Sequence, residues 1–236
     1  MTNDNAASVF DRDGWWDESC RDFASLRAVN EVRLSILRRW MTDWFPTQLP
    51  AVVADLGCGG GLMSVALART GARVVGVDRA HNALRSASQQ AEPRAHFVCG
   101  DIAAPGIADE TVDLAMLCDV VEHLPEPRVA VAAAARMLRP GGALFVNTIN
   151  RTMRARVLAV WFGEGLGLIP RGTHDARMFV RPSELRDSAS AAGLRATHAC
   201  GERPRLLASL RSRCVQLAPA RSMAVSYCMG FVKEAR

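Results

Sequence analysis

Three side chains that could bind a ligand or move a proton lie close together near the middle of the 236-residue chain. Asp119, Glu122 and His123 are spaced i, i+3 and i+4, so one helical turn would place three potential ligands or bases on one face. A neutral imidazole titrates near neutral pH, which makes His123 the first candidate for a general base. In the alternative interpretation, Asp119 caps a helix and His123 packs against a pocket wall.

A glycine-rich segment, residues 55–61, is the second candidate site. It follows a short apolar run and precedes a predicted helix, and its glycines would let backbone N–H groups approach a ligand closely. Asp78 ends the next apolar run, where a carboxylate can accept hydrogen bonds from both hydroxyls of a ribose. Together, the loop and this acid predict a cofactor that contains a nucleoside.

The spacing of the glycines indicates which nucleoside this is. A dinucleotide-binding loop needs a third glycine at its sixth position, and Leu62 occupies that position here. The chain instead has an acid followed by glycines at alternating positions: Asp55, Gly57, Gly59 and Gly61. This pattern resembles the first motif of the class I S-adenosylmethionine (SAM)-dependent methyltransferases. SAM carries a sulfonium cation and no pyrophosphate, which suits an acidic loop.

The elements that position these residues alternate between strands and helices, which indicates an α/β fold. We expect a doubly wound, Rossmann-like, mostly parallel seven-stranded sheet with helices on both faces and an antiparallel last strand. The predicted strands are 52–56, 73–77, 96–99, 113–118, 143–148, 195–200 and 224–232. The predicted helices are 26–44, 62–69, 83–90, 128–138, 153–162 and 182–192, with an irregular glycine-rich segment at 163–175.

The length suits a single methyltransferase domain, residues 1–236. Within it we expect four parts in chain order. They are an N-terminal helical arm (1–50), a cofactor-binding core (51–150), a lid and substrate region inserted after strand five (151–192), and the C-terminal strands (193–236).

The composition excludes several other classes of protein. With 49% hydrophobic and 22% charged residues, the chain can bury a full core and is not a disordered tail. Its apolar runs are too short to cross a bilayer, and residues 1–17 lack the apolar core of a secretory signal. Seven irregularly spaced cysteines without a C-x-x-C pair argue against a disulfide framework and a structural zinc site, and they favour a cytoplasmic location.

The net charge of +5 is unevenly distributed along the chain. Residues 1–150 have 14 arginines and 18 acids (−4), whereas residues 151–236 have 14 arginines, one lysine and 6 acids (+9). The basic part could face an anionic substrate or a lipid surface, or its arginines could lie on solvated helix faces, which we favour. Few aromatic residues interleave with the arginines, so no nucleic-acid partner is expected.

The resemblance extends to one family, the ubiquinone-biosynthesis O-methyltransferases. The segments that carry it span about residues 15–190 and include a P-x-G-T-H-D motif, which is not a general Rossmann feature. They are Trp15–Asp17, Asn30-x-x-Arg33, 119–127 (DVVEHLPEP), 147–151 (NTINR), 170–175 (PRGTHD), Phe179 and 182–185 (PSEL). The chain departs from the family pattern at Glu31-Val32, where Pro-Leu is usual, at Asp119, where Glu is usual, and over 201–222.

The resemblance implies which residues hold the cofactor. The family uses the arginine of N-x-x-R, a glycine of the first motif, the acid that ends strand two, and the residue before Asp119. The class also places an acid after strand three beside the adenine. The full set expected to bind SAM is Arg33, Asp55, Gly57, Cys58, Gly59, Gly61, Asp78, Arg79, Asp101, Ile102 and Cys118.

The resemblance also bears on catalysis. Related enzymes are similar to catechol methyltransferases in using a divalent metal, which would make Asp119, Glu122 and His123 ligands of Mg²⁺ that acidifies a phenol. His174 of the T-H-D motif lies either in the pocket or in a structural position. The catalytic candidates are therefore His123, Glu122, Asp119 and His174. Trp15, Trp16 and Trp161 could stack on an aromatic acceptor or lie buried in a lid.

The sequence therefore predicts transfer of a methyl group from SAM to a small aromatic acceptor, with O-methylation of a phenol or catechol as the leading reaction. The alternative is C- or N-methylation of an aromatic, for example indole-type, specialised metabolite. Leu62 argues against a nicotinamide oxidoreductase, and the acid–histidine set argues against a non-catalytic SAM-binding protein. A peripheral membrane contact through residues 154–169 is less favoured than a packed lid. The sequence leaves the oligomeric state open.

Overall fold

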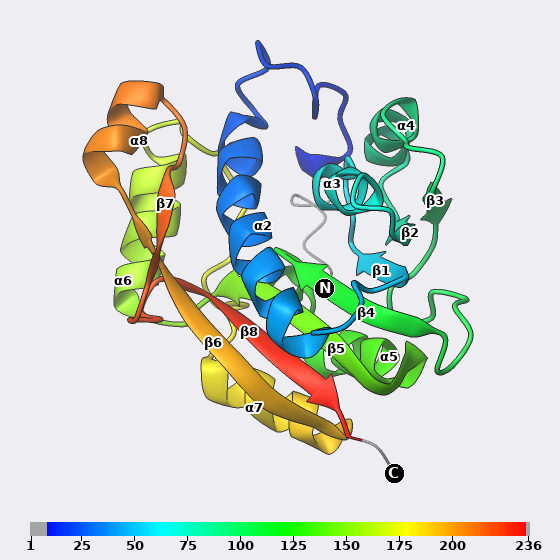
Figure 1. Cartoon of the computed structure of the whole chain (residues 1–236). Helices are drawn as coiled ribbons and strands as arrows, with labels where there is room; N and C mark the ends of the chain where they lie inside the picture. The colour runs from blue at the N-terminus through cyan, green and yellow to red at the C-terminus, as the bar shows by residue number, and fades with distance from the viewer. Residues whose placement is uncertain (1–8, 235–236) are drawn as a thin grey trace.

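The apolar runs of the sequence form the strands of one sheet. In the computed structural model, which describes residues 9–234, helices cover both faces of this sheet (Figure 1). The strands are β1 (Val52–Leu56), β2 (Arg73–Asp78), β3 (Ala95–Cys99), β4 (Val112–Cys118), β5 (Leu138–Ile149), β6 (Leu194–Pro204), β7 (Leu217–Ala220) and β8 (Ser226–Lys233). The helical segments are α2 (Ala24–Trp44), α3 (Leu62–Ala68), α4 (His81–Gln89), η1 (Val121–His123), α5 (Pro127–Met137), α6 (Met153–Arg156), η2 (Val157–Glu164), α7 (Pro182–Ala191) and α8 (Leu206–Ser212).

The strand order is β3-β2-β1-β4-β5-β8-β6-β7. Strands β1 to β5 pair in parallel, β8 runs antiparallel to both β5 and β6, and β7 runs antiparallel to β6. The order reverses between β1 and β4, which creates a crevice at the carboxyl ends of these strands. The predicted fold class is confirmed.

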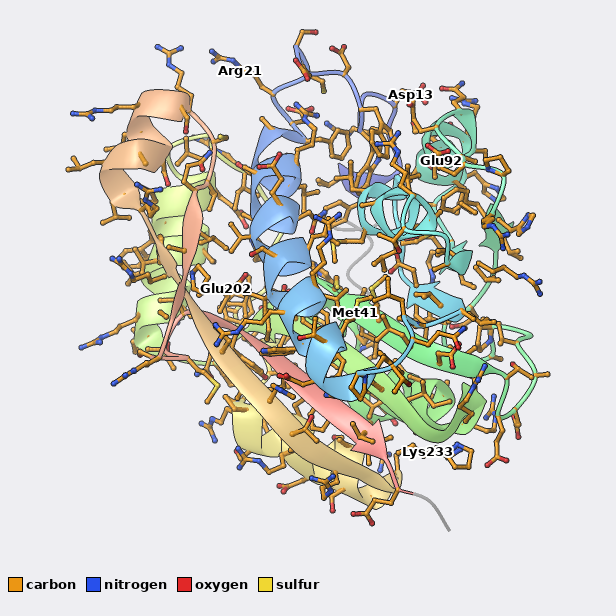
Figure 2. The ribbon with its side chains drawn as sticks, in the orientation of Figure 1. Asp13, Arg21, Met41, Glu92, Glu202 and Lys233 are labelled. Atoms are coloured by element: carbon orange, nitrogen blue, oxygen red, sulfur yellow. The ribbon has the colours of Figure 1, made fainter. Side chains whose placement is uncertain are left out.

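Side chains of the central strands alternate between two buried layers because successive residues of a strand point to opposite faces. Leu114 and Met116 of β4 pack in the layer that α2 and α3 cover, which also contains Met41, labelled in Figure 2. Ala115 and Leu117 pack in the layer that α5 and α7 cover. Since both faces are buried, β4 consists almost entirely of apolar residues.

Two elements were not predicted. The sheet has eight strands and not seven, because residues 217–220 form β7 at its edge. Pro219 and the lack of apolar alternation hide this strand in the sequence, and an edge strand tolerates proline because one of its sides needs no ladder donor. Helix α8 precedes β7 in the stretch where the resemblance is weakest, and Leu207 on α8 is 74% exposed.

The predicted lid region has an unexpected helical form. Instead of one amphipathic α-helix over 153–162, α6 ends after one turn and continues as the π-helix η2 to Glu164. Figure 1 shows α6 beside α8 at the end of the molecule away from β3. The predicted N-terminal arm corresponds mainly to α2, and residues 1–8 of that arm lie outside the described residues.

Candidate active site

The loop between β1 and α3 lies at the crevice. Gly57 has φ +79°, a left-handed conformation that glycine adopts without strain. A Cβ atom on Gly57 would lie 2.4 Å from Cγ2 of Val120, and one on Gly60 would lie 2.2 Å from Cγ of Trp15. The loop therefore requires glycine because Val120 and Trp15 pack directly against its backbone.

Two carboxylates flank this loop, and each binds groups that are near in the chain. Asp78, at the end of β2, accepts hydrogen bonds from the backbone N–H groups of Gly59 (2.8 Å) and Ala80 (2.9 Å). Asp55 accepts one from Oγ of Ser64 at 2.5 Å. Burial raises the pKa of Asp55 to about 6, against the opposing effect of the Ser64 hydrogen bond. A carboxylate has about four acceptor positions, so Asp78 can still accept from two ribose hydroxyls.

A cavity of about 660 Å³ opens beside the loop, within the usual size range of small-molecule sites. Nine of the residues predicted to bind the cofactor line it: Asp55, Gly57, Cys58, Gly59, Asp78, Arg79, Asp101, Ile102 and Cys118. Gly61 does not line the cavity. It precedes α3, and a Cβ atom there would lie 2.8 Å from Cβ of Ala87, so this glycine allows α3 and α4 to pack closely.

The lining of the larger cavity fits SAM. Asp78 offers its carboxylate at the end of β2, where a ribose would be held. Ile102 and Leu124 offer apolar surface for a purine, and Asp101 lies among the lining residues as an acceptor for an exocyclic amine. Asp119 contributes negative charge toward which a sulfonium would be attracted.

A second cavity, of about 110 Å³, adjoins the first. Four residues line both cavities: Phe10, Leu26, Asp119 and His123. Most other lining residues are apolar and come from segments that are distant in the sequence; they include Val29, Ile149, Leu158, Phe162, Val215 and Leu217. The shared residues place the contents of the two cavities next to each other, as direct group transfer requires.

Arg33 lies at the smaller cavity and not, as predicted, at the larger one. Its Nη1 donates a hydrogen bond to Oδ2 of Asp119, and its Nε lies 3.5 Å from Oε1 of Glu202. Glu202 is fully buried on β6, beside α2 in Figure 2, and its Oε2 accepts a hydrogen bond from Nδ2 of Asn147 at 2.8 Å. Burial alone would lower the pKa of Arg33, but the two carboxylates raise it, so Arg33 stays a cation.

The prediction that Asp119, Glu122 and His123 share one helical face is wrong. Asp119 has a left-handed backbone (φ +54°), and the helical turn that follows, η1, is a single 3₁₀ turn. Glu122 lines neither cavity; it is 2% exposed and accepts a hydrogen bond from Oγ1 of Thr148 at 2.7 Å. Burial, together with the charge of Asp119, raises the pKa of Glu122 to about 8.

This arrangement does not fit the predicted magnesium site. One oxygen of each carboxylate is engaged, Oδ2 of Asp119 by Arg33 and Oε2 of Glu122 by Thr148, and Glu122 lies outside the cavities that Asp119 and His123 line. Across residues 9–234, no three histidine, cysteine, aspartate or glutamate side chains are grouped so that they could hold a metal ion.

Two histidines line the smaller cavity, with ring centroids 6.0 Å apart. Burial, followed by the neighbouring His174, lowers the pKa of His123 to about 4. Nδ1 of His123 is buried and has no hydrogen-bond partner in the described part of the chain. His174 differs, because its Nδ1 lies 3.0 Å from Oε1 of Glu164.

The three tryptophans that could stack on an acceptor lie outside the smaller cavity. Trp15 lines the larger cavity and stacks on Phe23 with centroids 4.4 Å apart. Nε1 of Trp16 donates a hydrogen bond to the carbonyl of Gly60 at 2.7 Å. Trp161 is 66% exposed, and none of the three lines the smaller cavity. Trp15 and Trp16 therefore hold the N-terminal segment against the glycine loop.

Four polar residues near the smaller cavity were not found from the sequence: Asn147, Thr148, Glu164 and Glu202. The first two lie in the NTINR segment, at the carboxyl end of β5, and this position could have identified them. Glu164 and Glu202 have no comparable local signal, since their partners are defined only by the fold.

The comparisons with known proteins agree with this fold. Residues 54–146 match the family model for a methyltransferase domain. A SAM-dependent methyltransferase from Thermotoga maritima aligns with a TM-score of 0.66 at 17% identity, over 97% of this chain and 100% of that one. Magnesium protoporphyrin IX methyltransferase from Synechocystis, solved with bound S-adenosylhomocysteine (SAH), aligns with a TM-score of 0.63 at 18% identity, over 97% and 93%. The fold and site thus define a class I SAM-dependent methyltransferase.

Closer relatives identify the family. The ubiquinone biosynthesis O-methyltransferase of Ralstonia nicotianae is 38% identical over 188 residues, which cover 76% of this chain and 75% of that protein. The protein of the same name from Rhizobium johnstonii is 38% identical over 200 residues, 79% of each chain. The chain belongs to the ubiquinone-biosynthesis O-methyltransferase family, and it is a SAM-dependent small-molecule methyltransferase. None of the helices within residues 9–234 has the length and hydrophobicity that a membrane crossing needs.

Proposed function

We propose that this protein methylates a hydroxyl group on a small aromatic acceptor. The observation that carries the proposal is the pair of adjoining cavities, one suited to a nucleoside and the other mostly apolar, with Asp119 and His123 between them. The names of the relatives, which are O-methyltransferases of ubiquinone biosynthesis, support oxygen as the methylated atom.

The size of the smaller cavity bears on the acceptor. A closed apolar cavity of roughly 150 Å³ can hold benzene, so the 110 Å³ found here corresponds to no more than one aromatic ring, whose substituents would extend beyond this cavity. Its aliphatic and aromatic walls would bind the faces of such a ring. Thr173, Ser226 and the two histidines are the polar groups that could orient its substituents.

SAM supplies an electrophilic methyl group on a sulfonium, and the residues of this chain must align that group with the acceptor oxygen. Asp78 and the glycine loop would fix the nucleoside end of the cofactor. Phe10 and Leu26, which line both cavities, would exclude water from the gap between the reactants. Asp119 would keep negative charge near the sulfonium while Arg33 holds that carboxylate in place.

The alternative function is methylation of a ring carbon or ring nitrogen. It would use the same two cavities, and what separates it from O-methylation is the atom that receives the methyl group. Because the relatives are named O-methyltransferases, we favour an oxygen as the atom that receives the methyl group.

The test is a transfer assay with SAM labelled in its methyl group. The acceptors are phenol and catechol derivatives, the same rings with each hydroxyl already methylated, and indoles. We expect mass spectrometry to find the label as a new methyl ether on hydroxyl-bearing rings only, with Asp78→Ala as the negative control. Label on ring carbon or nitrogen would establish the alternative, and no transfer to any phenol would overturn the proposal.

A further inference from the structure

Glu164 holds His174 in a fixed orientation at the smaller cavity. Oε1 of Glu164 accepts hydrogen bonds from the backbone N–H of His174 (2.9 Å) and from its Nδ1 (3.0 Å), and Oε2 accepts one from the backbone N–H of Gly172 (2.7 Å). Both side chains are largely buried, with 10% of His174 and 8% of Glu164 exposed. Three bonds from the 172–174 turn to one carboxylate leave the imidazole little freedom.

The π-helix explains how Glu164 reaches this turn. η2 carries the chain along the smaller cavity with Leu158, Ala159 and Phe162 in its lining, and Glu164 is its last residue. Short π-helical segments are rare and occur frequently at functional sites. Here the segment places a buried carboxylate directly behind a cavity-lining histidine.

The hydrogen bond also determines the tautomer of His174. Burial alone would raise the pKa of Glu164, but the hydrogen bonds from His174 and Gly172 outweigh it and lower that pKa, so Glu164 is ionised at neutral pH. An ionised carboxylate only accepts hydrogen bonds, so Nδ1 of His174 must carry the hydrogen. Nε2 is then left with its lone pair, and it has no protein partner among residues 9–234.

We propose that His174 is the general base of the reaction and that Glu164 is the positioning residue that orients it. This rests on the proposed O-methylation. Nε2 of His174 takes the proton of the acceptor hydroxyl, and the oxygen forms a bond to the methyl carbon. The bond from that carbon to sulfur breaks with its electron pair going to sulfur, which yields a methyl ether and SAH. The positive charge passes from the sulfonium to the imidazolium, where the Glu164 carboxylate stabilises it.

His123, the first candidate from the sequence, is less suited to this role. Its Nδ1 is buried without a partner in the described chain, so no group fixes its tautomer. Phe10 meets its ring edge-on with centroids 5.7 Å apart, and Asp119, the carboxylate whose charge acts on His123, is already bound to Arg33. The structure assigns His123 to the wall between the two cavities.

The first experiment reads the tautomer directly and needs no turnover. ¹⁵N-detected NMR of the histidine side chains, with His174→Asn to assign the signal, should find Nδ1 protonated and Nε2 unprotonated in the wild-type protein at neutral pH. Glu164→Ala should shift the signal toward the Nε2–H tautomer. The hydrogen on Nε2 in the wild type, or a signal that Glu164→Ala does not move, would overturn the proposed pair.

The second experiment separates chemistry from folding. His174→Ala should lower kcat by roughly 100-fold or more, the usual contribution of a general base, and added imidazole should restore part of it. Glu164→Gln should lower kcat by roughly tenfold. Calorimetry should find SAH affinity close to that of the wild type in both variants. A merely structural role for His174 would give no rescue by imidazole.

The chain contains a matched control pair. His198 and Asp43 form a similar histidine–carboxylate contact, with Nε2 3.0 Å from Oδ2, on the surface away from both cavities. Asp43→Asn should leave kcat unchanged. Two results would contradict the roles of His174 and Glu164 but leave the proposed O-methylation intact. In the first, the wild type methylates phenols and His174→Ala keeps the wild-type kcat. In the second, only His123→Asn loses kcat and is rescued by imidazole. If the wild type methylates no phenol, the function fails whatever the NMR result.

Discussion

The two cavities are built in different ways. Around the larger cavity, the proposed cofactor site, both acids bind partners in the β1–α3 loop, in α3 or directly after β2: Asp55 binds Ser64, and Asp78 binds Gly59 and Ala80. Around the smaller cavity, the proposed acceptor site, the pair Arg33 and Glu202 joins distant segments, although Glu164 and His174 are only ten residues apart. The first site is therefore a local product of strand, loop and helix, whereas the second depends on the assembly of the whole fold.

A second difference concerns unpaired polar atoms. Within residues 9–234, every buried side-chain nitrogen or oxygen without a hydrogen-bond partner belongs to the region of the acceptor cavity. These atoms are Nε of Arg33, Oε1 of Glu122, Nδ1 of His123, Oδ1 of Asn147 and Oε1 of Glu202. Two of these atoms, Nε of Arg33 and Oε1 of Glu202, face each other at 3.5 Å as an ion pair without a hydrogen bond. Leaving buried polar atoms without hydrogen bonds costs free energy, so this region is less completely satisfied than the larger cavity. The following substitutions test that contrast.

The largest effect is expected at Glu202. Glu202→Ala removes a fully buried carboxylate from Arg33, which keeps only Asp119 as an anionic partner, and from Nδ2 of Asn147, which keeps the carbonyl of Tyr227. We expect the free energy of unfolding to fall by about 3 kcal/mol, the lower end of the cost of breaking a buried ion pair. Urea denaturation measures this, with Glu92→Ala as the control, because the half-buried Glu92 (labelled in Figure 2) pairs with Arg69 at the surface. An unchanged midpoint would show that long-range pairs do not stabilise the acceptor side.

The next effect is on cofactor affinity. Asp78→Ala removes an acceptor of charge-assisted hydrogen bonds from the cofactor cavity. We expect the Kd for SAH to rise by about 100-fold, equivalent to about 2.7 kcal/mol. Isothermal calorimetry tests this, and an unaltered Kd would remove the assignment of the larger cavity to SAM.

A third prediction concerns pH and Glu122. The pKa of this carboxyl is about 8 in the folded protein, mainly because of burial, against an ordinary value of 4.5. Its contribution to stability is therefore fully present below pH 4.5 and is lost as pH rises to about 8. Glu122→Gln removes this titration, so its unfolding free energy relative to wild type should increase by about 3–4 kcal/mol between pH 5 and 8. Urea unfolding at several pH values checks this, and a difference that does not vary with pH would contradict it.

The smallest effect is expected at Trp161. This side chain is 66% exposed and lies outside both cavities, although the sequence offered it as a partner for the acceptor. Trp161→Ser should change the unfolding free energy by less than about 0.5 kcal/mol and leave acceptor KM unaltered. A large rise in KM would mean that the acceptor extends beyond the smaller cavity and over η2.

The sequence by itself determined the fold class and predicted nine of the residues that line the larger cavity. Apolar runs with period two and their connecting helices are local signals, and parallel strands bring their carboxyl ends to one edge. For this reason Gly57, Asp78 and Asp101 could be placed together from their positions in the chain alone. Gly61 was misplaced because a glycine needed for helix packing and a glycine at a ligand follow the same pattern.

Only the tertiary structure decided which side chains surround the smaller cavity, the proposed acceptor site. The i, i+3, i+4 rule failed at Asp119 because a left-handed residue precedes a single 3₁₀ turn, so Glu122 points into the protein instead of into a cavity. The pairing of Arg33 with Glu202 joins α2 to β6, and that of Glu164 with His174 depends on a π-helix. No short-range pattern encodes the contact of Arg33 with Glu202, because it forms only when distant segments pack together. Glu164 and His174 are only ten residues apart, but no periodic pattern predicts the π-helical form of η2 that brings them together.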